Sequence, residues 1–351
     1  MKNLGIIILN TLILFIIINV LIGFTWPIVS DLKNKEHSYN DEQIKLLDLN
    51  ENDLVLLQNE TWRKDYKFIF VPFIGHSEID KKGKFVNFTI KNGRAINRPK
   101  NCEKNIYVYG GSTTFGYNVT DYQTIAAYLQ QGLRNDKCVY NHGRAGFNST
   151  QENNLIFSHL EEGRKIDFAI FLDGVNEVCG GHQFANQLEA NFSKLMEKPY
   201  YLWKDSTRTF VYSLPLYQLY LKFFDSDWLT NVNNKEYLSL ETCEKKIPLN
   251  VLFENRLKLR NSICVSFKVN CYTFLQPMPG ASGKRSSSIT VESEKFFKKK
   301  YSILKKTKGN FIDINYILNA NNNVSYIDNV HYTPETNEKI AQEIKKIIFN
   351  R

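Results

Sequence analysis

The chain has 351 residues, 43% of them hydrophobic and 13% aromatic, so it is long and apolar enough to build a sizeable core. This composition excludes a disordered chain, a collagen and a coiled coil. The net charge of +9 is scattered along the sequence without a nucleic-acid-binding motif, so we expect no nucleic acid among the partners.

Residues 1–27 are predicted to form a transmembrane signal anchor. The run from Gly5 to Gly23 is uncharged and consists almost entirely of Ile, Leu, Val and Phe. An apolar helix of about 20 residues spans a bilayer core. The run lacks the short apolar region and small-residue cleavage site of a cleavable signal peptide, so we expect it to be retained. Lys2 favours a cytoplasmic N-terminus, which would place the remaining chain outside the cytoplasm, attached to the membrane.

Three segments are predicted to follow this anchor. Residues 28–65 are polar and are interpreted as a juxtamembrane stalk with one short helix. Residues 66–100 form a small β-rich lead-in, in which we find no evident chemistry. Residues 101–351 form the main domain, with an insertion at about 180–245 that is rich in Tyr, Trp and Leu and is predicted to be helical.

Within the main domain, short apolar runs alternate with helical patterns. Strands are predicted at 106–109, 139–140, 168–172, 271–275 and 311–317. Ser149 and Glu152 are expected to form a capping box, and Thr333 with Pro334 is expected to begin the last helix. Repeated strand–helix–strand units predict a doubly wound parallel sheet.

The six cysteines can pair completely in an oxidising compartment, and none has the CxxC spacing of a zinc or redox site. Cys102 and Cys138 each precede an apolar strand, so parallel neighbouring strands would bring them together. Cys264 and Cys271 are close in sequence, which leaves Cys179 to pair with Cys243. These three disulfides are hypotheses, because six cysteines allow fifteen connectivities.

The candidate functional residues all follow predicted strands. Ligands of doubly wound sheets bind beyond the carboxyl ends of the strands. Ser112 follows the first strand, Gly146 the second and Asn176 the third, while Asp328 and His331 follow the last. We therefore expect these five residues to meet at one edge of the sheet.

Their chemical types suit acyl transfer. His331 is the expected base that removes the proton of the Ser112 hydroxyl and makes it a nucleophile. Asp328 is expected to accept a hydrogen bond from the imidazole, fixing its tautomer and stabilising the imidazolium. The negative oxygen of a tetrahedral intermediate needs donors, which the N–H groups of Ser112 and Gly146 and the amide of Asn176 would supply.

Four ordered blocks resemble those of the SGNH (GDSL-like) hydrolases: GGSTTFG at 110–116, NHGRAG at 141–146, DGVNE at 173–177 and DNVH at 328–331. The resemblance spans about residues 105–351. It implies a flavodoxin-like sheet of order 2-1-3-4-5 and serine esterase chemistry without a metal or other cofactor. Carried over residue by residue, it gives Ser112, Asp328 and His331 as the catalytic triad, and Ser112, Gly146 and Asn176 as the oxyanion hole.

Two positions depart from the family pattern. Gly111 stands where the family has Asp before the serine, and Glu177 stands where an Asp commonly follows the third-block Asn. Neither position supplies a triad member, so we expect them to alter shape or substrate preference before activity. An α/β-hydrolase does not fit, because Gly-x-Ser-x-Gly requires glycine at position 114, which is threonine.

The sequence thus predicts an extracytoplasmic serine esterase that cleaves O-acyl esters, with O-acetyl groups on a glycan as the expected substrate. Two alternatives stay open: an O-acetyltransferase using the same acyl-serine, and a non-catalytic glycan-binding or scaffolding protein. His142 and His182 lie near the same edge and are interpreted as loop or packing residues. Glycans at the sequons of Asn118 and Asn148 would crowd the site, so we interpret these sequons as unused.

Overall fold

A computed structural model describes residues 2–33, 45–61, 68–177, 214–215, 248–285, 291–318, 324–328 and 330–349. The chain divides into two compact units, Met1–Asn40 with Ala190–Ser239, and Asp41–Glu189 with Leu240–Arg351. Almost all of the predicted insertion, with His182 and the proposed Cys179–Cys243 pair, lies outside the described residues.

In the first unit, helix α1 (Lys2–Lys33) contains the predicted anchor. Its stretch Gly5–Gly23 has a mean hydropathy of 2.8, so this helix is long and apolar enough to cross a membrane. Its described apolar side chains are largely exposed, as in Ile7 and Leu21. The apolar helix predicted from the sequence is therefore present.

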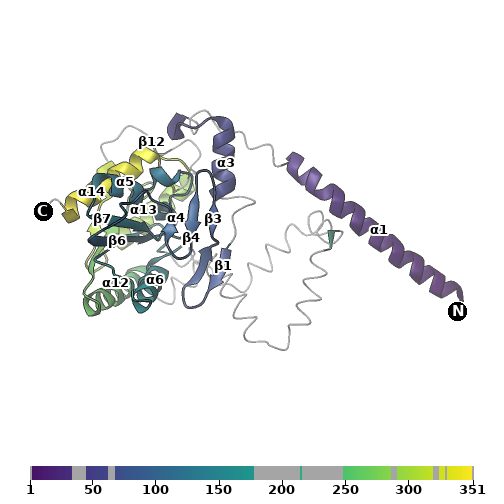
Figure 1. Ribbon diagram of the computed structural model, residues 1–351, viewed down its shortest axis with the longest axis horizontal. Coiled ribbons are helices and arrows are strands. Elements are labelled where there is room, and N and C mark those ends of the chain that lie inside the picture. The colour runs from purple at the N-terminus through teal and green to yellow at the C-terminus, as the bar shows by residue number, and fades with distance from the viewer. Residues whose placement is uncertain are drawn as a thin grey trace. The chain divides into compact units, whose positions relative to one another are not determined.

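The second unit is built on an eight-stranded sheet of order β11-β9-β8-β6-β7-β5-β4-β3 (Figure 1). Five of these strands, β7, β6, β8, β9 and β11, run parallel to one another. Their bounds are β6 (Lys104–Gly110), β7 (Lys137–Asn141), β8 (Phe168–Asp173), β9 (Asn270–Leu275) and β11 (Ile312–Asp313). The predicted α/β architecture with a mostly parallel sheet is confirmed.

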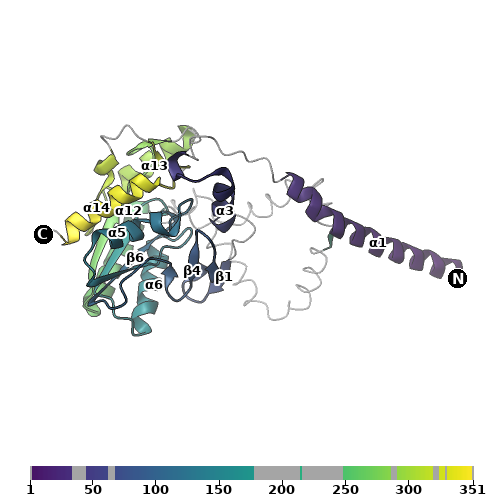
Figure 2. The same ribbon diagram turned by 45° about the horizontal axis from the view of Figure 1, so that its top comes forward.

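Helices cover both faces of this sheet, because its central strands are apolar on both faces. In β6, Ile106 and Val108 belong to a core shared with α5 (Ile125–Gly132) and α14 (Pro334–Phe349). The alternate residues Tyr107 and Tyr109 belong to a second core with α6 (Ser149–Glu161). Helix α12 (Leu249–Ser266) packs beside α6 on this second face, and Figure 2 shows α14 lying along α5 on the first.

The predicted lead-in extends the sheet. Strands β5 (Gly93–Arg94), β4 (Asn87–Thr89) and β3 (Lys81–Lys82) continue it in antiparallel fashion from the edge of β7. The preceding strands β1 (Phe68–Val71) and β2 (Gly75–Glu78) form a separate antiparallel hairpin.

Part of the predicted stalk also belongs to the second unit. Residues Glu51–Thr61 form helix α3, in which Leu54 and Leu57 are buried. The buried Glu60 carboxylate of this helix accepts hydrogen bonds from the backbone N–H groups of residues 84, 85 and 86 at 2.8–2.9 Å. These bonds fasten the helix to the loop before β4.

The last parallel strand was predicted at 311–317, but β11 has only two residues. Asp313 ends it, because its carboxylate accepts hydrogen bonds from the backbone N–H and side-chain amide of Asn315, each at 3.0 Å. A 3-10 helix, η4 (Asn315–Leu318), follows β11. Two further strands form a separate parallel pair: β10 (Lys284–Arg285), which precedes helix α13 (Val291–Leu304), and β12 (Val324–Tyr326), which follows η4.

Of the two predicted helix N-caps, that of α14 is as expected and that of α6 differs. The Thr333 hydroxyl accepts from the Thr336 N–H at 3.3 Å, with Pro334 at the first position of α14, as predicted. Helix α6 is capped one residue earlier than expected, by Asn148 in a capping box with Gln151. The predicted cap Ser149 donates its hydroxyl to Glu177 instead, at 2.6 Å.

Two predicted disulfides are confirmed. Cys102 pairs with Cys138 at a Cα separation of 5.6 Å, close to the start of the neighbouring parallel strands β6 and β7. Cys264 in α12 pairs with Cys271 in β9 at a Cα separation of 6.1 Å.

Candidate active site

The structure brings the three predicted triad residues into one hydrogen-bonded chain. Ser112 begins the short helix α4 (Ser112–Phe115) directly after β6. Its Oγ lies 2.9 Å from His331 Nε2. His331 Nδ1 lies 2.7 Å and 2.9 Å from the two carboxylate oxygens of Asp328. Since Asp328 can only accept while ionised, Nδ1 carries the proton and Nε2 is free to accept from the serine hydroxyl.

The Asp328 carboxylate is held from several sides. Its Oδ1 accepts hydrogen bonds from the N–H groups of Val330 and His331, at 2.9 and 2.8 Å. Its Oδ2 accepts from the side-chain amide of Asn118 at 2.7 Å. Burial alone would raise the pKa of this carboxyl, but the charge and hydrogen bonds of His331 and the two N–H groups hold the pKa below its usual value. Asp328 therefore stays ionised and keeps its hold on the imidazole.

Asn118 was missed as a functional residue. It is buried and has a left-handed backbone, with φ of 63°, which Asn adopts more readily than most residues. Its position in the sequence, two residues after the first block, is the only local feature that connects Asn118 with the site. Its burial also agrees with the interpretation that its sequon is unused.

His331 is 4% exposed, and its ring stacks on that of Tyr117 at 5.5 Å between centroids. Gln276, which follows β9, ties the nucleophile turn to the histidine loop. Its Oε1 accepts a hydrogen bond from the Thr113 hydroxyl at 2.8 Å and one at 3.0 Å from the Tyr332 hydroxyl, which shares its single proton with the Pro277 carbonyl oxygen. These two donors are the residues that follow Ser112 and His331. Nothing in the sequence indicated Gln276, because its role depends on the meeting of three loops.

Of the predicted oxyanion donors, the amide of Asn176 lies directly beside Gly111, the residue that precedes Ser112. A Cβ added at Gly111 would lie 2.1 Å from the Asn176 Nδ2 and 3.2 Å from the Phe147 carbonyl oxygen. The Asn176 amide donates to that carbonyl at 2.9 Å. Gly146, which precedes Phe147, has φ of 68°, a conformation that favours glycine. The glycine at 111, where the family has Asp, thus leaves the space that the Asn176 amide occupies.

The loops that carry the nucleophile and the predicted oxyanion donors show the same pattern of solvent exposure. Ser112, Gly146 and Asn176 are half-buried, whereas the residues directly after them are buried. A substrate can therefore reach the hydroxyl and the donors, while their supports are shielded from water.

The second departure from the family pattern, Glu177, belongs to a buried charge network behind the site. Its carboxylate accepts from the Ser149 N–H at 3.0 Å and from Arg256 at 3.0 Å. The longer side chain thereby reaches both α6 and α12, and it anchors the loop that carries Asn176.

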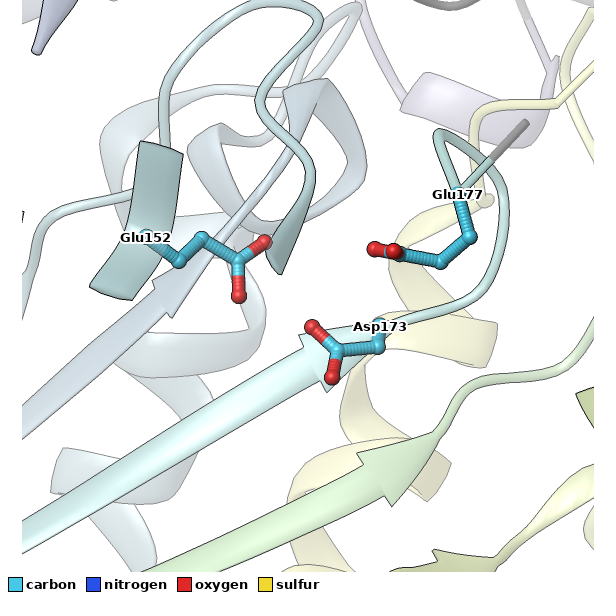
Figure 3. Close-up of side chains that lie close together, drawn as sticks. All are labelled: Glu152, Asp173 and Glu177. Atoms are coloured by element: carbon cyan, nitrogen blue, oxygen red, sulfur yellow. The ribbon is translucent and has the colours of Figure 1, made fainter. Parts of the chain in front are cut away.

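Two further carboxylates complete this network. Figure 3 shows Glu152, Asp173 and Glu177 turned toward one another, and their oxygens lie within 4.8 Å of each other. Arg260 donates to Asp173 at 2.6 Å and to Glu152 at 3.0 Å. The guanidinium groups of Arg256 and Arg260 thus provide the positive charge that such a cluster requires. Burial and the neighbouring Asp173 raise the pKa of Glu152 well above its usual value, although the charge of Arg260 lowers it in part.

His142, by contrast, does not belong to the site. It is fully buried and its ring stacks on that of Tyr107 at 5.1 Å. Burial lowers its pKa well below the usual value, which keeps the ring neutral. This agrees with the packing role expected from the sequence.

No family model matches the sequence, and no curated protein matches it. Several solved esterase structures are similar to it. A carbohydrate acetylesterase from Sinorhizobium meliloti has 10% identity and a TM-score of 0.39, covering 70% of this chain and 98% of that one. The aryl esterase of M. smegmatis has 11% identity and a TM-score of 0.37, covering 70% and 99%. Esterase EstA from Pseudoalteromonas has 11% identity and a TM-score of 0.37, covering 71% and 98%.

The chain resembles the SGNH (GDSL-like) hydrolases in its four sequence blocks, and these blocks meet in the folded chain. A Ser–His–Asp chain of hydrogen bonds at the carboxyl edge of a parallel sheet is the arrangement of a serine ester hydrolase.

Proposed function

We propose that this protein is a serine esterase that cleaves O-acyl esters through an acyl-serine intermediate. The observation that carries the proposal is the unbroken hydrogen-bonded chain from Ser112 through His331 to Asp328. In this chain the serine is half-buried while the histidine is buried. Such an arrangement leaves the nucleophile open to substrate and the base shielded from bulk water.

The proposed reaction follows from the positions of these atoms. His331 Nε2 takes the proton as Ser112 Oγ attacks the ester carbonyl. Asp328 stabilises the imidazolium that forms at Nδ1. The negative carbonyl oxygen is met by the N–H groups of Ser112 and Gly146 and the amide of Asn176. The protonated imidazole then gives its proton to the leaving alcohol oxygen, and water, activated by the same base, releases the acid from the acyl-serine.

For the substrate we propose an O-acetyl ester on a glycan outside the cytoplasm, with helix α1 as an uncleaved membrane anchor. The length and hydropathy of Gly5–Gly23 support the anchor. Two disulfides support an oxidising compartment. The membrane and an acylated glycan are accordingly the proposed partners.

Covalent labelling tests the catalytic part of the proposal. A fluorophosphonate probe should label the wild-type protein stoichiometrically, and Ser112→Ala should abolish both labelling and hydrolysis of p-nitrophenyl acetate. Ser302→Ala is a matched control, because Ser302 is exposed and its hydroxyl only donates to the carbonyl of Lys299 within α13. A wild-type protein that is folded but not labelled would refute the proposal.

The substrate is tested separately with acetylated cell-envelope glycans. Release of acetate to water supports the esterase. Acetate that appears only on an added oligosaccharide would replace the esterase by a transferase with the same acyl-serine. No acetate loss from any glycan, together with hydrolysis of p-nitrophenyl acetate, would overturn the glycan part alone.

A further inference from the structure

The β1–β2 hairpin, which we expected to hold no chemistry, contacts the loop that carries Gly146. His76 in β2 is fully buried, and its Nε2 lies 2.7 Å from the carbonyl oxygen of Ala145. A carbonyl oxygen only accepts hydrogen bonds, so the His76 Nε2 carries a proton and donates it. The hairpin therefore holds one side of the peptide group that joins Ala145 to Gly146.

This peptide group is the one whose N–H is the proposed oxyanion donor. In a planar trans peptide, the C=O of one residue and the N–H of the next point in opposite directions. Fixing the Ala145 carbonyl toward His76 therefore directs the Gly146 N–H away from the hairpin. Within the part of the chain that the structure describes, no protein group accepts a hydrogen bond from this N–H. A hydrogen bond to the carbonyl also polarises the peptide and makes its N–H a stronger donor.

A second hairpin residue fixes the peptide on the other side of Ala145. The Ala145 N–H donates to Glu78 Oε1 at 2.9 Å. The buried guanidinium of Arg144 lies 3.7 Å from the other oxygen of this carboxylate. Both backbone groups of Ala145 are thus held by side chains of β2, so the loop cannot rotate without breaking two hydrogen bonds to buried side chains.

Aromatic side chains in turn hold the imidazole of His76. The ring packs edge-on against Phe68 and against Phe147, each at 5.2 Å between centroids. Phe147 is also the residue whose carbonyl accepts the amide of Asn176. Phe147 therefore connects His76 to two proposed donors, the N–H of Gly146, which precedes it in the chain, and the side-chain amide of Asn176.

We propose that His76 is a positioning residue of the oxyanion hole, acting through the Ala145 carbonyl to orient the Gly146 N–H. This inference rests on the proposed esterase function. It gives His76 a role in catalysis although this residue precedes all four sequence blocks.

Amide side chains provide a graded test, because the Gln amide nitrogen can replace Nε2 of histidine whereas the shorter Asn amide cannot reach the same acceptor. We expect His76→Asn to lower kcat about ten- to hundredfold, less than the roughly 10²–10³-fold cost of deleting an oxyanion donor. KM for p-nitrophenyl acetate should change little, and His76→Gln should recover most of the loss. Active sites are counted by fluorophosphonate titration, so that kcat refers to folded enzyme.

Ser77→Ala is the matched control. Ser77 is buried in the same strand, but its hydroxyl donates to the Glu78 carbonyl at 3.0 Å and does not contact Ala145. It should lower the melting temperature without changing kcat per titrated site. Unchanged kcat in His76→Asn, or equal losses in the Asn and Gln variants, would overturn the inference. A wild-type enzyme without esterase activity would instead refute the proposed function.

A measurement on the wild-type protein covers the case in which the variants do not fold. NMR of protein with ¹⁵N-labelled histidine identifies the protonated ring nitrogen of His76. We expect a proton on Nε2 and a hydrogen-bond coupling to the Ala145 carbonyl. A ring protonated on Nδ1 alone would overturn the inference.

Discussion

Substituting Gly111 by alanine should disable the oxyanion hole while leaving the fold intact. Gly111 has φ of −80°, which alanine also adopts, so the effect of the substitution comes from the contacts of the added Cβ. That carbon would lie 2.1 Å from the Asn176 Nδ2. Ordinary contact begins at about 3.4 Å, so the amide must withdraw by roughly 1.3 Å. It is the end of a side chain that can rotate, so we expect the collision to be relieved by Asn176 rather than by the backbone.

The size of the effect follows from what the amide is proposed to do. A misplacement of about 1 Å in a catalytic group can lower the rate about 10²-fold, and complete loss of an oxyanion donor costs about 10²–10³-fold in kcat. We therefore expect Gly111→Ala to lower kcat about 10²-fold, or about 2.7 kcal/mol in the activation free energy. KM and the melting temperature should change little.

A double-mutant cycle with Asn176→Ala is the assay. Once the Asn176 side chain is absent, the alanine at 111 meets only the Phe147 carbonyl oxygen at 3.2 Å, which has to yield by a few tenths of an ångström, so the double variant should be little slower than Asn176→Ala. Gly132→Ala is the control for adding a methyl group, because its carbon would meet only the flexible side chain of Lys345, at 3.3 Å. Equal losses from Gly111→Ala in both backgrounds would refute the reasoning, as would full activity in the single variant.

Two further predictions concern pH and stability. The lowered pKa of Asp328 means that its ionised form stabilises the fold above the unfolded value of 3.8, and that this contribution disappears as the pH falls through the lower folded pKa. Asp328→Asn should therefore melt below wild type at pH 7, with the gap closing in acid; a gap that persists at low pH would contradict this. For Glu152 the sign is opposite, because its folded pKa lies above the unfolded value of 4.5 and the unfolded state releases the proton first. Glu152→Gln should gain stability relative to wild type as the pH rises above 4.5, by at most about 1.4 kcal/mol per pH unit. A difference in melting temperature between the two proteins that does not change with pH would contradict the raised pKa.

The sequence was sufficient for the sheet and for the residues that meet at its edge. Apolar runs such as 168–172 are buried on both faces, and this pattern alone indicates a parallel strand. The carboxyl ends of parallel strands lie on the same edge of the sheet, so Ser112, Gly146 and Asn176, which follow three such strands, are expected on that edge. These predictions depend only on local patterns and on a general property of the fold.

The supporting residues could not be predicted in the same way. Asn118, Gln276 and His76 each contact a site loop that is distant in sequence, and no local spacing marks such a contact. The strand predicted at 311–317 was too long, because the end of β11 is set by hydrogen bonds between Asp313 and Asn315, not by loss of hydrophobicity. Similarly, Ser149 does not cap its helix as expected, because its hydroxyl donates a hydrogen bond to Glu177.

The strands contributed by residues 81–94 have a consequence for the behaviour of the protein in solution. They pair with β7 at its last residue, where Arg94 lies opposite Asn141, and so shorten an edge that could pair with another molecule. The sheet ends instead at β3, which has only two residues, Lys81 and Lys82. A short edge strand made of two like charges resists edge-to-edge association. A fragment that begins at residue 101 would lose this protection together with His76, and it should aggregate as well as lose activity.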